Sequence, residues 1–211
     1  MGFDMWMFAR LDYQDREKRR AEKSLEFIWR PFYDHLGKSS QIFTSAFYDE
    51  YWVPGNLLPA MSPRNHANPV IIEEDYPLFN ANQTAETFMA YLTKQAAATK
   101  TDNLFVPIGG DFQFNDGPWR YRSIDNLMKV FNAMYSNMTM MYSTPSKYLD
   151  AIIAANETWP TKYDDMLPYA QYKDDYWTGF YTSRPNFKSY IRRGQHHNLA
   201  ANRAFSLMIL N

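Results

Sequence analysis

The chain contains no cysteine among its 211 residues, which excludes a disulfide framework, a cysteine nucleophile and a thiolate metal site. It also lacks an excess of either charge, with 22 Lys and Arg against 23 Asp and Glu. Surfaces for nucleic acid or anionic membranes need a basic excess, so we expect neither partner. The mean hydropathy is -0.55, and no window approaches the roughly 20 apolar residues of a membrane span. We therefore expect no membrane span.

What the chain has in abundance is aromatic side chains, with 16 Tyr, 15 Phe and 6 Trp. Its length suits one mid-sized domain or a domain and a half. Several rings lie beside carboxylates in segments without helical periodicity. This combination suits carbohydrate, because the C–H face of a sugar packs on a ring while its hydroxyls need charged or amide partners. The rings that we expect in loops are Tyr51, Trp52, Trp119, Tyr176 and Trp177.

The N-terminal segment is typical of a strand in a domain interior. Only Asp4 interrupts the apolar character of residues 1–8, which predicts a buried strand. The segment has no basic start, long apolar stretch or small-residue cleavage site of a signal peptide. Trp6 stands where N-myristoylation requires Ser or Thr. We therefore expect the chain to begin inside a domain.

Helical and strand patterns alternate along most of the chain. Thr144 and Pro145 fit the N-cap and first position of a helix. The charge run at residues 16–20 mixes acids and bases, so we expect a solvated helix face there. The alternation favours an α/β fold with a parallel sheet covered on both faces. The expected helices are 15–29, 82–100, 122–135 and a fourth from 145, and the expected short buried strands are 104–108 and 139–142.

Two stretches depart from this alternation. Residues 39–77 are rich in proline and aromatics and only weakly periodic, as in the long loops that usually carry function. Residues 163–185 are dense in aromatics and acids, and residues 187–210 have helical spacing. We expect the C-terminal end to be the beginning of a second, helical domain.

Residues just beyond the C-terminal ends of strands in an α/β sheet or barrel face the active site. Asp111 follows the strand expected at 104–108 and two glycines, which leave room for a ligand or permit unusual backbone angles. Arg10 and Asp12 follow the first strand in the same way. The alternative for Asp111 is a helix cap or a loop acid, and for Arg10 and Asp12 an internal ion pair or cap. These alternatives stay open from the residues alone.

The four histidines do not form a recognisable metal-binding pattern. His196 and His197 are neighbours, and neighbours on a helix point about 100° apart, which suits joint ligands poorly. His35 and His66 are isolated in expected loops. We expect no metal site from this chain alone.

Four stretches, in this order and spacing, cover almost the whole chain. They are 1–4 with 9–14 (Met-Gly-Phe-Asp and Ala-Arg-Leu-Asp-Tyr-Gln), 109–114 (Gly-Gly-Asp-Phe-Gln-Phe), 142–145 (Tyr-Ser-Thr-Pro), and 165–169 with 176–185 (Asp-Met-Leu-Pro-Tyr and Tyr-Trp-Thr-Gly-Phe-Tyr-Thr-Ser-Arg-Pro). Any one of them would be a weak signal. Together they resemble the glycoside hydrolase family 38 alpha-mannosidases, particularly the lysosomal type.

The resemblance implies a zinc-dependent retaining exo-mannosidase, with a seven-stranded α/β barrel followed by a three-helix bundle and large β domains. It places residues 1–168 in the C-terminal part of the barrel domain and residues 169–211 at the start of the helical domain. It implies that Asp111 is the general acid/base, which protonates the departing oxygen and then deprotonates water. In the same resemblance Tyr51 matches a tyrosine that contacts the sugar, Arg10 an arginine near the nucleophile, and Trp177 a tryptophan of the pocket wall.

The family's nucleophile segment and its His-x-Asp pair of zinc ligands have no match in this chain. Residues 196–198 (His-His-Asn) lack the Asp and the downstream Gly-Thr of the family's last zinc-ligand segment. We therefore expect an internal fragment, inactive by itself, that joins the remaining segments of the same enzyme to act on mannose-containing oligosaccharides. The alternatives are a non-catalytic mannose-binding or structural relative and an unrelated aromatic-rich α/β domain.

The expected location is the lysosome or another secretory or vacuolar lumen, and it rests mainly on the resemblance. Three Asn-x-Thr sequons, at Asn82, Asn137 and Asn156, point in the same direction, although one or two arise by chance.

Overall fold

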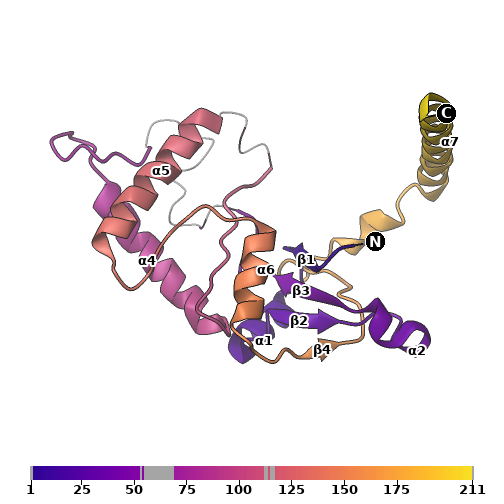
Figure 1. The fold of residues 1–211 in the computed structure, drawn as a ribbon, viewed down its shortest axis with the longest axis horizontal. Coiled ribbons are helices and arrows are strands. Elements are labelled where there is room, and N and C mark those ends of the chain that lie inside the picture. Colours follow the sequence, from indigo (N-terminus) through magenta and orange to yellow (C-terminus); the bar gives the residue numbers. More distant parts are fainter. Residues whose placement is uncertain (1, 53, 55–68, 112–113, 115–116, 211) are drawn as a thin grey trace.

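The computed structural model describes residues 2–52, 54, 69–111, 114 and 117–210. The fold is mixed α/β, as the sequence predicts, with a four-stranded sheet beside a group of helices (Figure 1). The strands are β1 (Met5–Phe8), β2 (Glu26–Trp29), β3 (Ile42–Ala46) and β4 (Thr161–Lys162). The helices are α1 (Tyr13–Glu22), α2 (Tyr33–Leu36), α4 (Ala81–Ala98), α5 (Gly117–Met134), α6 (Pro145–Ala154) and α7 (Pro185–Leu210), with 3-10 turns η1 (Gly37–Ser40) and η3 (Thr178–Tyr181).

The sheet has the order β1-β3-β2-β4. The sequence predicts a parallel sheet, and this prediction is wrong for one of the three strand pairs. β1 pairs with β3 in parallel, whereas β2 runs antiparallel to β3 and parallel to β4. β1 is also not a buried strand, because it lies at the sheet edge and its Trp6 is 37% exposed. The barrel implied by the family resemblance stays a prediction.

The helix predicted at 15–29 is wrong in its second half. α1 ends at Glu22, and Lys23 adopts a left-handed conformation with a φ of 53°. Leu25, Ile28 and Trp29 fit helical spacing, yet they lie in or next to β2, where Phe27 is fully buried. A short apolar run fits both the helical and the strand period. Pairing with β3 makes this segment a strand.

The charge run on α1 is also not uniformly solvated. Arg16 is only 8% exposed, although its neighbours Glu17 and Lys18 are exposed. One position of a polar helix can face the protein when its guanidinium finds acceptors inside.

The expected loop at 39–77 contains β3, which the sequence analysis missed, and its residues 53 and 55–68, with His66, lie outside the described residues. Conversely, the strands predicted at 104–108 and 139–142 do not form. Gly109, which follows the first of these segments, makes an isolated parallel bridge to Trp52. Trp119, expected in a loop, lies in α5.

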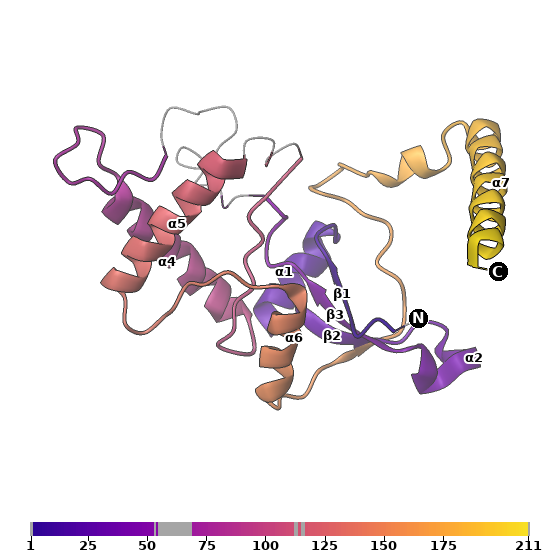
Figure 2. The same cartoon turned by 45° about the horizontal axis from the view of Figure 1, so that its top comes forward.

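The main core lies between α4 and α5, which pack side by side in Figures 1 and 2. The structure confirms α4, α5 and α6, although α5 begins at Gly117 and not at the predicted residue 122. Thr144 caps α6 by accepting a hydrogen bond from the Lys147 amide. Met134 of α5 and Ile153 of α6 lie outside the buried faces, with exposures of 39% and 62%. The buried members of this core are Val70, Ala81, Ala85, Phe88, Leu92, Ile124, Leu127 and Phe131.

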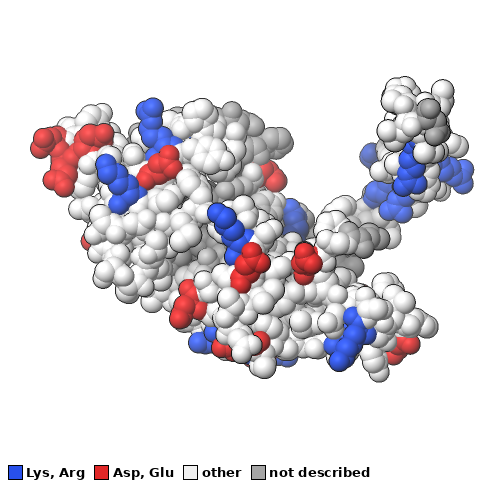
Figure 3. All heavy atoms as spheres, viewed as in Figure 1, with Lys and Arg blue, Asp and Glu red and all other residues white. Residues whose placement is uncertain are grey.

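The C-terminal helix, α7, is confirmed as a long helix, and it stands away from the sheet in both ribbon views. None of its residues is buried. In Figure 3 the Lys and Arg side chains gather on α7, whose sequence contains no Asp or Glu, while both signs mix elsewhere on the face shown. No helix in the described residues has the length and apolar character needed to cross a membrane.

The α4–α5 core predicts a clear mutational contrast. Leu127 is fully buried, so we expect Leu127→Ala to lower the free energy of unfolding by roughly 2–5 kcal/mol. Lys129→Ala, at an exposed position of the same helix, should change it by less than about 0.5 kcal/mol. Urea unfolding followed by circular dichroism measures both, and equal effects would contradict the assigned core.

A buried carboxyl in β2 predicts a pH dependence of stability. Glu26 is 4% exposed, and burial raises its pKa above the ordinary 4.5, against the opposing hydrogen bonds from Tyr148 and Ser45. The folded state therefore holds the proton more tightly than the unfolded state, so the contribution of Glu26 is full below its unfolded pKa and is lost as pH rises through the folded pKa.

We expect Glu26→Gln to flatten the fall in stability as the pH rises above about 4.5, because an amide does not titrate. The exposed Glu22→Gln variant serves as the control. Urea midpoints across this range for both variants give the comparison, and an unchanged pH slope in Glu26→Gln would refute the assignment.

Candidate active site

The edge of the sheet brings together the ends of two strands that carry predicted site residues. β1 and β3 are parallel with Phe8 opposite Ala46, so both chains leave the sheet at the same edge. Arg10 follows β1 by two residues, and Tyr51 follows β3 by five. The antiparallel β2 does not disturb this arrangement, because it lies on the other side of β3.

Tyr51 joins Arg10 to Asp111 through its hydroxyl group. Arg10 Nη2 donates to the Tyr51 oxygen at 3.2 Å, and the Tyr51 hydroxyl donates to Asp111 Oδ1 at 3.2 Å. The hydrogen bond with Tyr51 is the main cause that raises the pKa of Arg10, so the guanidinium stays charged. A cation, a hydroxyl and a carboxylate thus form one hydrogen-bonded row.

Trp177 closes the other side of Arg10. The guanidinium carbon lies 4.5 Å from the centroid of the indole ring, and the Trp177 Nε1–H donates to Asp175 Oδ2 at 3.3 Å. The structure therefore brings all four predicted site residues into one group, which we call the Arg10 cluster: Arg10, Tyr51, Asp111 and Trp177. Their individual roles stay predictions.

Local backbone geometry places Asp111 beside Tyr51. Trp52 and Gly109 form a parallel bridge, and Trp52 stacks on Tyr51 with centroids 5.1 Å apart. Gly110 has a φ of 137°, a region that favours glycine, which confirms the expectation of unusual backbone angles here. Phe112 and Gln113 of the same motif lie outside the described residues.

The Arg10 cluster is accessible. Arg10 and Asp111 are exposed in the described part of the chain, while Tyr51 and Trp177 are half-buried. A carboxylate that accepts a hydroxyl donor can take up a proton and return it, and flat rings beside it can pack on a sugar. The arrangement suits acid/base chemistry on a carbohydrate.

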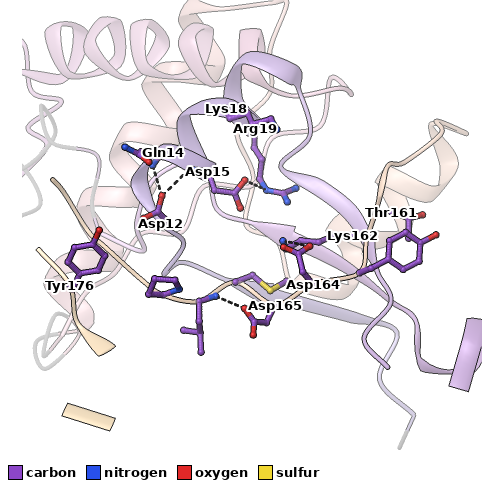
Figure 4. Close-up of a pocket in the computed structure, with 14 residues that line it drawn as sticks. Asp12, Gln14, Asp15, Lys18, Arg19, Thr161, Lys162, Asp164, Asp165 and Tyr176 are labelled. Atoms are coloured by element: carbon purple, nitrogen blue, oxygen red, sulfur yellow. Dashed lines mark hydrogen bonds and ion pairs between the residues drawn. The ribbon is translucent and has the colours of Figure 1, made fainter. Parts of the chain in front are cut away.

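A cleft elsewhere in the described residues is a separate feature. It has a volume of about 760 Å³ and lies between the start of α1 and residues 161–168, with Tyr176 at one end (Figure 4). Its acids are already used within the chain. Asp12 caps α1 by accepting from the amides of Gln14 and Asp15, Asp15 pairs with Arg19, Asp164 with Lys162, and Asp165 accepts from the Leu167 amide.

Two conclusions follow from the cleft. The cap alternative for Asp12 is confirmed, whereas Arg10 is committed to Tyr51 and Trp177 rather than to an ion pair with Asp12. Lys162 lowers the pKa of Asp164, as expected for an internal ion pair. None of the four predicted site residues of the Arg10 cluster lines this cleft.

A metal centre does not emerge from the described residues. They contain no group of three or more His, Asp or Glu side chains that could hold an ion. His196 and His197 lie exposed on α7, and His35 lies in α2. The described residues therefore offer no ligand set of their own for the zinc ion that the family resemblance implies.

Two residues behind the Arg10 cluster escaped the sequence analysis. Tyr169 packs edge-on against Trp177 with centroids 5.8 Å apart, and its hydroxyl donates to Glu50 Oε1 at 3.4 Å. Burial and the nearby Glu50 charge raise the pKa of Tyr169 to about 12. Both residues stand in stretches already notable for other reasons, since Glu50 precedes Tyr51 and Tyr169 ends the motif at 165–169.

The comparison with protein families decides the affiliation. The N-terminal domain of glycosyl hydrolases family 38 matches residues 1–172. The chain belongs to glycosyl hydrolase family 38. This finding confirms the resemblance drawn from the four stretches and excludes an unrelated α/β domain.

The relatives of this family 38 chain include several alpha-mannosidases. It is 42% identical over 186 residues to an alpha-mannosidase of Canavalia ensiformis and 40% identical over 203 residues to one of Arabidopsis thaliana. It is 32% identical over 195 residues to the lysosomal alpha-mannosidase of Homo sapiens. These matches cover 87%, 95% and 91% of this chain but only 18%, 19% and 19% of the relatives, so the chain spans about a fifth of their length.

The contact between Arg10 and Trp177 can be tested by a double-mutant cycle. Arg10→Met and Trp177→Leu should show a coupling of about 0.5–1 kcal/mol in the free energy of unfolding, as expected for a cation over an accessible indole ring. Trp159, whose ring contacts Phe43 and Lys100, provides the control partner. Coupling of the same size between Arg10→Met and Trp159→Leu would speak against a specific contact.

Proposed function

We propose that this chain is part of the catalytic domain of a retaining alpha-mannosidase that removes terminal alpha-mannose from N-glycan-type oligosaccharides. The observation that carries the proposal is the Arg10 cluster, in which Asp111 is linked through Tyr51 to Arg10, and Arg10 lies on Trp177. Membership of family 38 and the alpha-mannosidase relatives support it.

Asp111 is proposed to act as the general acid/base. In the first step its proton moves to the glycosidic oxygen as the C–O bond breaks and the sugar carbon bonds to a second carboxylate. In the second step Asp111 takes a proton from water, which displaces that carboxylate from the same carbon. The second carboxylate, the nucleophile, is proposed to lie outside this chain.

The remaining members of the Arg10 cluster are proposed to bind the sugar. The Trp177 ring offers a flat apolar face for C–H groups, and the Tyr51 hydroxyl and Arg10 guanidinium offer polar groups to sugar hydroxyls. Arg10 would also stabilise negative charge near the nucleophile.

Zinc dependence is proposed from the family resemblance alone. Because the described residues offer no suitable set of ligands, the zinc ligands are proposed to come from other segments of the same enzyme. When bound, zinc would supply a Lewis acid for sugar hydroxyls.

The domain division and the location are also proposals. Residues 1–168 would belong to the barrel domain and residues 169–211 to the helical domain. A lysosomal or other lumenal location is supported by the lysosomal relatives from Homo sapiens and Dictyostelium discoideum. The asparagines of the three sequons, Asn82, Asn137 and Asn156, are all exposed and could carry glycans.

Asp111→Asn tests the proposed catalytic role in the longer polypeptide that contains this chain. Loss of the acid/base should lower kcat by roughly 10²–10⁴-fold for an oligosaccharide substrate. The first step should suffer much less for a dinitrophenyl mannoside, because that leaving group departs without a proton. Steady-state and single-turnover kinetics with both substrates make the comparison.

Asp102→Asn is the matched control, because Asp102 is an exposed acid that lies before the same segment. Equal losses for the two substrates, or for the two variants, would contradict the acid/base role. Mannose binding without turnover in the wild-type polypeptide would instead favour a non-catalytic mannose-binding relative.

The chain by itself, residues 1–211, should not hydrolyse mannosides, because the covalent step has no nucleophile. Release of product from the purified chain, abolished by Asp111→Asn, would overturn this expectation.

A further inference from the structure

A buried ion pair lies directly behind the Arg10 cluster. Arg16 Nη2 donates to Glu50 Oε1 at 2.9 Å, and the two side chains are only 9% and 14% exposed. The same nitrogen donates to the backbone oxygen of Ala9. One guanidinium group of α1 thereby holds both the end of β1 and the segment that follows β3.

Both residues that accept a hydrogen bond from Arg16 stand next to a member of the Arg10 cluster. Ala9 precedes Arg10, and Glu50 precedes Tyr51. The third connection runs through Tyr169, whose hydroxyl donates to Glu50 Oε1 and whose backbone oxygen accepts from the Trp177 amide at 3.1 Å. The ring of Tyr169 also contacts the Trp177 ring.

Directional bonds to the Arg16–Glu50 pair fix the relative positions of three segments that are far apart in the chain. Apolar packing would tolerate small sliding of these segments, whereas the hydrogen bonds of the Arg16 guanidinium and the Glu50 carboxylate specify their spacing. The Arg10 cluster needs such spacing, because its two hydrogen bonds, both 3.2 Å long, have little room for displacement.

We propose that Arg16 and Glu50 are positioning residues of this active site, which set the distances among Arg10, Tyr51 and Trp177 without touching the substrate. The proposal rests on the proposed function for its kinetic consequence. Its geometric part concerns the chain alone.

The kinetic test uses Glu50→Gln in the longer polypeptide that contains this chain. A misplacement of about 1 Å can cost on the order of 10²-fold in rate, so kcat/KM should fall by about 10–100-fold while the fold stays intact. Asp15→Asn is the matched control, because it removes the acid of another ion pair on α1, with Arg19 at 3.1 Å. It should change kcat/KM by less than about twofold, because this half-buried pair is an i, i+4 contact within α1.

The geometric test uses the chain labelled with 5-fluorotryptophan, in which the Trp177 signal is assigned by its loss in Trp177→Phe. The fluorine signal of Trp177 should move in Glu50→Gln and Arg16→Met but stay unchanged in Asp15→Asn. Arg16→Lys keeps the charge and should restore part of the Arg16→Met effect. It also provides a folded variant if Arg16→Met does not fold.

The outcomes separate the two proposals. A wild-type polypeptide without mannosidase activity refutes the proposed function, while the fluorine signals still decide the positioning role. An unchanged Trp177 signal and unchanged kcat/KM in folded Glu50→Gln would overturn the positioning role. So would a loss of activity that Asp15→Asn reproduces.

Discussion

The parallel pairing of β1 with β3 is the constraint on which the candidate site depends. Because β1 and β3 run in the same direction, both strands end at the same end of the sheet. The residues that follow Phe8 and Ala46 can therefore meet there. Arg10 and Tyr51 are 41 residues apart in sequence, yet they share a hydrogen bond. The antiparallel β2 lies on the other side of β3 from β1, so it does not separate the ends of β1 and β3.

The ion pair between Arg16 and Glu50 extends this constraint to the third segment of the site. The pair makes two further hydrogen bonds, because Arg16 donates to the backbone oxygen of Ala9 and Glu50 accepts from the Tyr169 hydroxyl. The ion pair adds little apolar burial, but its hydrogen bonds fix the relative orientation of the three segments. For a site built from three separate segments, a fixed relative orientation matters more than additional apolar packing.

The sequence predicted the longer helices well, because α4, α5 and α6 each carry an apolar face over several turns and Thr144 marks a clear beginning. It failed at the short elements. The run from Leu25 to Trp29 fits a helix or a strand equally, and β3 lies in a stretch whose prolines suggested a loop. Elements of four or five residues contain too few side chains to establish a period, so pairing partners decide their type.

The sequence by itself determined the family, the identity of the Arg10 cluster and the absence of thiol chemistry, since each depends only on which residues are present and in what order. The tertiary structure alone decided that these residues meet, that Asp12 serves as a helix cap, and that Arg16 is buried behind the site. The physical reason is that contacts between distant segments depend on strand pairing and on directional hydrogen bonds. Neither the choice of strand partners nor a hydrogen bond between distant residues produces a periodic pattern in the sequence.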